Sequence, residues 1–205
     1  MLDISFSVNC LLKKDSTLKD LFYDPPIENL HAESNYFQSI VRSIVYQQLS
    51  GKAARKIHKR FINIFKLGKY PDPKDVLNIS RKKLRSVGLS YMKVGYIKNV
   101  ALYFIKNPKI ISTLDQKSDQ EIIDLISSIK GVGVWTVQMF LMFTLNRPDI
   151  FPVTDLALQK GYSAFYKKKN LEDPKIMLNH SKKWIPHRTT MSLYLWRYLE
   201  GPFEW

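Results

Sequence analysis

The sequence predicts an all-α protein. Apolar residues recur at helical spacing along most of the chain, and residues that begin or end helices bound these runs. The pattern is clearest after Ser118, which forms an S-x-x-E capping box with Glu121. The apolar stripe of the helix that follows comprises Ile122, Leu125, Ile126 and Ile129. No alternation of strands with helices is visible, so a mixed α/β class is excluded.

The N-terminal end is the hardest part to assign. Residues 1–12 mix β-branched and aromatic side chains, which predicts a short strand or an irregular strap. Asp15 and Ser16 then begin a short helix, and Pro25-Pro26 ends it, because proline cannot continue the backbone ladder.

Two amphipathic helices follow and meet at a polar corner. Asn35 and Gln38 resemble a capping pair for the first helix, and Gln47–Gly51 breaks its apolar pattern. The second helix carries its cations on the side opposite its apolar residues: Lys52, Arg55, Lys56, Lys59 and Arg60. Because both helices bury their apolar faces, the corner between them is expected to point outward.

Capping residues place the next helices. Asp72-Pro73 begins a short helix, Ser80 caps the following one, and Gly88 is expected as its left-handed C-terminal residue. A longer helix is predicted over 91–106, ended by Asn107-Pro108. Its buried face is expected to contain Val94, Ile97, Ala101, Phe104 and Ile105.

A tight hairpin joins two helices in the second half of the chain. The helix from Ser118 stops at Gly131-Val132-Gly133, and a second amphipathic run begins at Val134. Two glycines around one aliphatic residue suit a turn that needs positive φ and the close approach of another backbone. After the loop 146–154, Asp155 is expected to open a third helix.

Three helices are predicted in the C-terminal part. The first runs from Asp155 to about Tyr166, and the second begins at Asp173-Pro174 and ends near Trp184. Pro186 then forces a bend. The last helix carries Met191, Leu193, Leu195, Trp196 and Leu199.

Composition restricts the function. The 205 residues contain 32 Lys and Arg against 18 Asp and Glu, for a formal net charge of +14, and 13% of them are aromatic. This balance suits a nucleic-acid partner, although a basic surface without a partner is the alternative. The single Cys10 excludes an intramolecular disulfide and a four-cysteine iron–sulfur cluster.

No apolar run reaches the roughly 18 residues that cross a membrane, and no secretory signal pattern is present. We therefore expect a soluble, intracellular monomer without a cofactor. Its place would be the cytoplasm or nucleoid, or the nucleus if the host is a eukaryote.

Four features together resemble a known family: the GVGVWT hairpin, Asp155 at its spacing from that hairpin, the segment QQLSGKAA, and WIPHRTTMSLYLW near the C-terminus. They resemble the helix-hairpin-helix (HhH-GPD) DNA glycosylases of base excision repair, and most closely the 3-methyladenine DNA glycosylase II type of the alkylation-repair branch. The resemblance covers roughly residues 35 to 200.

The resemblance implies a two-lobed helical fold with the active site in the cleft between the lobes. One lobe would comprise 1–34 plus 147–205. The other would comprise 35–146 and contain the helix-hairpin-helix at about 119–145.

The resemblance also implies the reacting residues. Asp155 would be the carboxylate that stabilises the positive charge developing on the sugar; the alternative is that it only caps its helix. Trp135 stands where bifunctional relatives have a nucleophilic lysine, which implies base removal without strand cleavage. Trp135 and Trp196 would line the base pocket, with core packing as the alternative. Other aromatic positions of that pocket fall on Met139 and Leu156.

Duplex DNA is the implied partner. Gln48, followed by Leu49 and Ser50, would fill the gap left by the flipped nucleotide; a plain helix–helix turn is the alternative. The DNA backbone would be held at Lys130, Gly131, Gly133 and Thr136. Relatives often bind a monovalent cation through hairpin carbonyls, and the matching positions are Ser127, Ile129 and Val132, although no side-chain pattern indicates an ion here.

The expected function is a monofunctional DNA glycosylase that removes alkylated purines of the 3-methyladenine and 7-methylguanine type. The alternatives are a glycosylase for another damaged or mismatched base, or a non-catalytic helix-hairpin-helix DNA-binding protein. Asp149 is a weaker rival for the catalytic carboxylate. Arg188 is expected in a structural ion pair, and His180 and His187 lack partners at metal-ligand spacing.

Overall fold

The computed structural model describes residues 2–22, 25–49, 51–66 and 68–201, and within these ranges it contains helices and no strand. The all-α prediction is therefore confirmed. Within the same ranges, Leu2 and Leu30 form an isolated antiparallel β-bridge. None of the helices in the described ranges combines the length and apolar character needed to cross a membrane.

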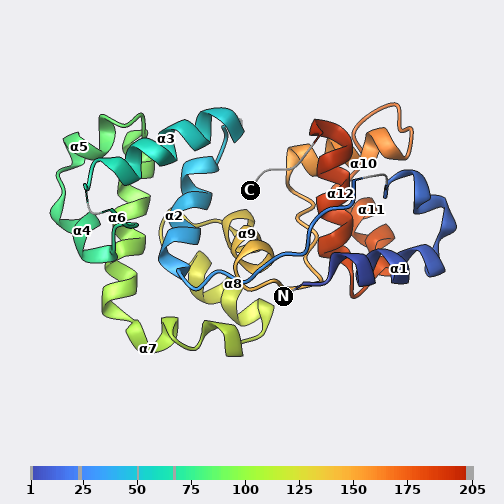
Figure 1. The fold of residues 1–205 in the computed structure, drawn as a ribbon, viewed down its shortest axis with the longest axis horizontal. Helices are drawn as coiled ribbons and strands as arrows, with labels where there is room; N and C mark the ends of the chain where they lie inside the picture. The colour runs from blue at the N-terminus through green and yellow to red at the C-terminus, as the bar shows by residue number, and fades with distance from the viewer. Residues whose placement is uncertain (1, 23–24, 50, 67, 202–205) are drawn as a thin grey trace. The chain divides into compact units, whose positions relative to one another are not determined.

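The chain folds into two compact units (Figure 1). One comprises Met1–Ala32 and Leu141–Trp205, and the other Glu33–Phe140. The expected boundaries were 34 and 147, so the second one lies a few residues later than in the structure. The reason is that the helix after the hairpin belongs to both units, because it continues from Val134 through Phe143.

In the unit formed by both ends of the chain, the described residues form α-helices and short 3-10 helices. These are α1 (Ile4–Lys14), η1 (Ser16–Asp20), α10 (Leu156–Phe165), α11 (Pro174–His180), η3 (Ser181–Trp184) and α12 (Arg188–Glu200). Helices α10 and α12 form its main packing contact.

The central unit is built on α2 and the long α6, against which the shorter helices pack (Figure 1). Its elements are α2 (Tyr36–Tyr46), α3 (Gly51–Asn63), α4 (Pro73–Asn78), α5 (Arg81–Arg85), α6 (Tyr91–Lys106), α7 (Pro108–Ile111), η2 (Leu114–Gln116), α8 (Asp119–Ser127) and most of α9 (Val134–Phe143).

Local hydrogen bonds start these helices where the sequence predicted. The Asn35 side chain accepts the N–H of Gln38 at 2.9 Å, and Ser118 and Glu121 form the reciprocal capping box of α8. Asp72 caps α4, and Ser80 caps α5. Each bond spans two or three residues, which is why sequence alone could locate the helix starts.

One helix face differs from its prediction. In α6, four of the five expected core residues are buried, but Ile105 is 37% exposed. It lies in the last turn of α6, just before Asn107 ends the helix, where the surrounding core ends.

The prediction of a strand or strap over residues 1–12 is wrong. Ile4–Lys14 forms α1, and Asp3 caps it by accepting the N–H of Phe6 at 2.8 Å. Ile4 and Leu11 are fully buried, seven residues apart on one helical face. Burial of that face therefore outweighs the low helix propensity of the other residues.

Candidate active site

Asp155 occupies the start of α10 in the unit formed by the chain ends. Its Oδ1 accepts the backbone N–H of Leu158 at 2.7 Å, which makes Asp155 the N-cap of the helix. The carboxylate therefore lies at the positive end of the helix dipole. Asp155 therefore caps α10, which both interpretations of this residue allow, and the cap fixes the orientation of its carboxylate.

A second donor reaches the same oxygen atom from α12. The indole Nε1 of Trp196 donates to Asp155 Oδ1 at 2.9 Å, although 41 residues separate the two in sequence. The Trp196 ring is 4% exposed and stacks on Phe143, with ring centroids 6.3 Å apart. The structure thus joins the predicted catalytic carboxylate to one predicted base-pocket residue.

Close packing of two helices makes this contact. Gly161 lies in α10, and a Cβ atom built there would stand 2.2 Å from the carbonyl oxygen of Leu195 in α12. Only glycine lets the two backbones come so near. Leu195 directly precedes Trp196, so this approach brings the indole to the beginning of α10.

The rival carboxylate has a structural partner. Asp149 accepts from Arg188 through both oxygens, at 2.7 Å from Nε to Oδ1 and 2.7 Å from Nη2 to Oδ2. This bidentate pair ties the loop before α10 to the first residue of α12. The prediction that Arg188 forms a structural ion pair is confirmed, and Asp149 is committed to that pair.

The polar corner of the central unit presents two of its three predicted wedge residues. Gln48 is exposed and has a positive φ of 56°, and Leu49 is 40% exposed. Ser50, the third, lies outside the described residues.

Two residues that sequence reasoning missed hold this corner. Gln47 Nε2 donates to the Thr136 hydroxyl at 2.9 Å and to the Gly131 carbonyl at 3.4 Å. Lys93 Nζ donates to the carbonyls of Val45 and Gln47 at 2.8 and 2.6 Å, at the C-terminal end of α2. Burial lowers the pKa of Lys93 below its ordinary value. The corner and the hairpin are therefore one connected structure.

The hairpin requires its first glycine. Gly131 has a φ of 101°, and a Cβ atom there would lie 2.0 Å from the Tyr96 ring. The close neighbour is thus an aromatic side chain of α6 and not the backbone that we expected. Asn99, one turn further along α6, donates to the carbonyl of Lys130 at 3.0 Å.

The second glycine has a different environment. Gly133 has no positive φ, is exposed, and has open space where a Cβ would stand. The positive φ expected in this hairpin is therefore supplied by Gly131 and not by Gly133. Its open surface at the beginning of α9 leaves room for an approaching backbone.

The other predicted hairpin contacts fall into two groups. Lys130 is exposed, whereas the side chain of Thr136 is only 1% exposed and accepts from Gln47. Thr136 is therefore buried beside the hairpin, and a contact between it and the DNA backbone stays a prediction. The Ile129 carbonyl already accepts the N–H of Val132 at 2.9 Å. Cation binding at the predicted carbonyls stays a prediction.

The remaining pocket positions differ in exposure. Trp135, in the first turn of α9, is half-buried in the central unit. Met139 is 1% exposed and belongs to the core, so it has no surface to offer a base. Leu156, directly after Asp155, is 54% exposed. Single exposed apolar residues are common on protein surfaces, so its exposure alone assigns Leu156 no role.

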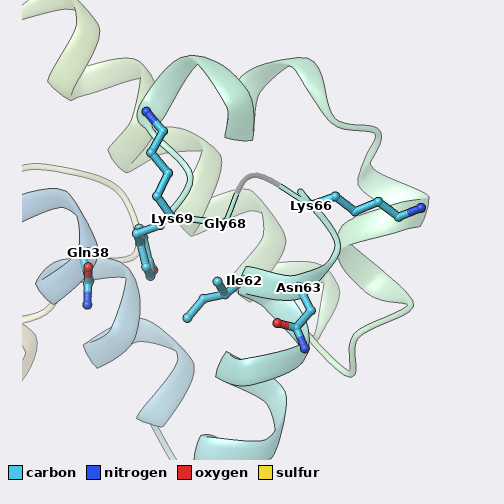
Figure 2. A pocket seen from close by; sticks show the side chains of 7 residues that line it. Gln38, Ile62, Asn63, Lys66, Gly68 and Lys69 are labelled. Atoms are coloured by element: carbon cyan, nitrogen blue, oxygen red, sulfur yellow. The ribbon is translucent and has the colours of Figure 1, made fainter.

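A hollow of about 490 Å³ lies elsewhere, beside α3 in the central unit (Figure 2). Its lining comprises Gln38, Ile62, Asn63, Lys66, Gly68, Lys69 and Tyr70. None of the predicted site residues is among them. The Lys66 and Lys69 side chains extend in different directions and do not converge on a common point (Figure 2).

A half-buried histidine contacts the same tyrosine. His58 Nε2 is 3.2 Å from the Tyr70 hydroxyl, and its ring stacks on Phe61. Burial, aided by the charge of Arg42, lowers the pKa of His58 to about 4. The imidazole is therefore neutral at physiological pH. Among the described residues, no group of three or more His, Cys, Asp or Glu is placed to hold a metal ion.

Comparisons with known proteins agree with this geometry. Residues 41–187 match the model of the HhH-GPD superfamily of base excision DNA repair proteins. DNA-3-methyladenine glycosylase 1 of Schizosaccharomyces pombe is 33% identical over 164 residues, which cover 78% of this chain and 71% of that protein.

Solved structures give the same result. The structure of the S. pombe 3-methyladenine DNA glycosylase in complex with abasic DNA has a TM-score of 0.85 and 28% identity, covering 98% of this chain and 99% of that one. A DNA-3-methyladenine glycosidase from Bacillus halodurans has a TM-score of 0.78 and 33% identity, covering 95% and 89%.

Proposed function

The chain belongs to the HhH-GPD superfamily of base excision DNA repair proteins, and from this premise we propose that it is a monofunctional DNA glycosylase that releases alkylated purines. The observation that carries the proposal is the carboxylate of Asp155, oriented by its own helix and by the indole of Trp196. The names of the S. pombe and B. halodurans relatives support the alkylpurine substrate class.

The reaction needs a base that has left the duplex. Stacking hides the glycosidic bond, so the nucleotide must be flipped into a protein pocket before chemistry. In our proposal Gln48 and Leu49 fill the gap in the duplex. The hairpin holds the DNA backbone through Lys130 and through N–H groups around Gly133, at the start of α9. The hydrogen bonds from Gln47 hold the corner and the hairpin together.

Cleavage of the bond leaves positive charge on the sugar. An ionised Asp155 beside the anomeric carbon would stabilise that charge and orient the attacking water. The Leu158 backbone N–H and the Trp196 indole N–H both donate to this carboxylate and hold its orientation. Preorganisation of this kind matters because the carboxylate need not reorient as charge develops.

Alkylation supplies the rest of the driving force. A 3-methylated adenine or 7-methylated guanine is cationic, so its glycosidic bond is already weakened. Aromatic rings attract a cation by about 0.5–2 kcal/mol each. We assign this role to Trp135, which is half-buried, whereas Trp196 is 4% exposed and acts by donating to Asp155. Since the position of Trp135 carries no lysine amine, we expect hydrolysis and no Schiff-base strand cleavage.

The test is base release. Wild-type protein and Asp155→Asn are incubated with alkylated duplex, freed bases are identified by chromatography, and strand nicks are scored with and without alkali. We expect wild type alone to release 3-methyladenine, with nicks only after alkali. The asparagine keeps an oxygen for the helix cap, so equal stability of the two proteins is the control. Full activity in Asp155→Asn would refute the catalytic role. Release of a different lesion only would redirect the substrate assignment.

A further inference from the structure

The net positive charge of this protein comes from one stretch of the chain. Residues 34–114 contain 17 Lys and Arg against 2 acidic residues, a net charge of +15. The rest of the chain contains 15 against 16, a net charge of −1. The two acidic residues of the stretch, Asp72 and Asp75, form the capping box of α4. The formal charge of +14 is therefore a local property and not a general surface bias.

Helix α3 concentrates this charge on one face. At 3.6 residues per turn, five cations fall within an arc of about 140°, while the buried Ala54 and Phe61 lie on the opposite side. The five are Lys52, Arg55, Lys56, Lys59 and Arg60, and all are exposed. The helix contains no acidic residue.

The neighbours of α3 supply no acidic residue either. Helix α2, which packs against α3, contains none. The turn around Gly88 also reaches α3, since a Cβ there would lie 3.2 Å from Ile57 Cγ1, and residues 80–90 contain none. Solvated faces of ordinary proteins mix both signs of charge, and this face does not.

The arrangement costs the free protein stability. Lys52 with Lys56, Arg55 with Lys59, and Lys56 with Arg60 are like charges four residues apart, which destabilise a helix. Lys52 also lies in the first turn, where a cation opposes the helix dipole. An anionic partner with regularly spaced charges would relieve this repulsion.

We infer that the basic face of α3 is a second DNA-binding surface, which holds phosphates of undamaged duplex beside the lesion. The inference rests on the proposed function for one point, that the corner at Gln48 and Leu49 enters the duplex. Helix α3 begins at Gly51, two residues after Leu49, so duplex held at the corner lies close to its first turn. Over the eight residues from Lys52 to Lys59 the cations span roughly 11 Å, which is room for several phosphates.

The experiment compares two variants of equal charge in the same unit. Lys56→Gln/Lys59→Gln removes two cations from the basic face. Lys106→Gln/Lys109→Gln removes two exposed cations from the end of α6 and from α7, and Figure 1 shows α3 and α7 beside opposite ends of α6. Long-range attraction falls equally in both variants, so a difference between them reports direct contact.

The affinity for an undamaged duplex is measured over a range of salt concentrations. Each lost phosphate contact should reduce the slope of log K against log salt by about 0.9, so the α3 variant should lose about 1.8 and the control almost nothing. The α3 variant should also melt at a higher temperature, because its two substitutions remove all three like-charge pairs. A raised melting temperature excludes misfolding as the cause of weak binding.

Equal slopes in the two variants would overturn the inference, whether both fall or neither does. Release of alkylated base by wild type is measured alongside. Wild type that binds duplex but releases no damaged base would refute the proposed function instead, so the two failures are distinguishable.

Discussion

The indole N–H of Trp196 and the backbone N–H of Leu158 both donate to Oδ1 of Asp155, at 2.9 and 2.7 Å. One donor comes from α12 and the other from the helix that Asp155 caps. A carboxylate held from two elements has little freedom to rotate. This is the property that a group stabilising a short-lived positive charge requires.

The Trp196→Phe variant should show whether Trp196 acts by orienting the Asp155 carboxylate or by packing its ring on Phe143. Phenylalanine keeps the ring contact with Phe143 but loses the donor to Asp155. A hydrogen bond to a charged group contributes about 1.5–3 kcal/mol, so single-turnover base release should slow roughly 10- to 100-fold. The matched control is Trp184→Phe, since the buried Trp184 Nε1 has no hydrogen-bond partner. Equal slowing in both variants would show that ring size, and not the donor, matters.

Neighbouring glutamines should have different roles. Gln47→Ala leaves the buried Thr136 hydroxyl without its donor, so the free energy of unfolding should fall by about 1–2 kcal/mol. Gln48→Ala alters an exposed side chain and should change stability by less than about 0.5 kcal/mol. Gln48→Ala should instead impair base flipping, measured with a fluorescent base analogue at the target position. Normal flipping in Gln48→Ala would remove this residue from the wedge.

The two hairpin glycines form a second matched pair. Gly131→Ala forces a Cβ into the Tyr96 ring at a positive φ, and these two effects together should cost about 2–5 kcal/mol of stability. Gly133→Ala meets open space and should be stable within about 0.5 kcal/mol. Its methyl group should nevertheless weaken DNA binding, because it stands where a phosphate would approach. Denaturant melts and duplex titrations of both variants test this, and unchanged binding in Gly133→Ala would contradict it.

Acid should destabilise the central unit through His58. Its pKa is lowered to about 4 in the folded protein from an ordinary value near 6.5, so between these values the unfolded chain binds more protons. The free energy of unfolding should therefore fall as pH drops from about 6.5 to 4, by on the order of 2–3 kcal/mol, and then level off.

The His58→Gln variant provides the comparison. Glutamine keeps a polar partner for Tyr70 but does not titrate, so urea melts at pH 7, 5.5 and 4.5 should show a smaller loss than wild type. Acidic residues titrate in both proteins and cancel in the difference. Parallel pH profiles would mean that the pKa of His58 is the same in the folded and the unfolded protein.

The sequence by itself determined where the helices begin and end, and it placed Asp155 at the start of one of them. Capping bonds reach only two or three residues, as from Ser118 to Glu121, and apolar periodicity repeats every turn, so a short window contains the whole signal. Residues 1–12 were mispredicted because α1 depends on burial against distant parts of the chain, which no short window contains.

Only the tertiary structure decided which side chains support the site. Gln47 meets Thr136 across 89 residues, Trp196 meets Asp155 across 41, and the Tyr96 ring fills the space beside Gly131. These partners depend on how the helices pack. Packing is driven by the burial of apolar surface, which is non-directional and produces no residue pattern at a fixed spacing in the sequence. The reacting residue could be predicted from the chain because its cap is local, whereas the residues that orient it could not.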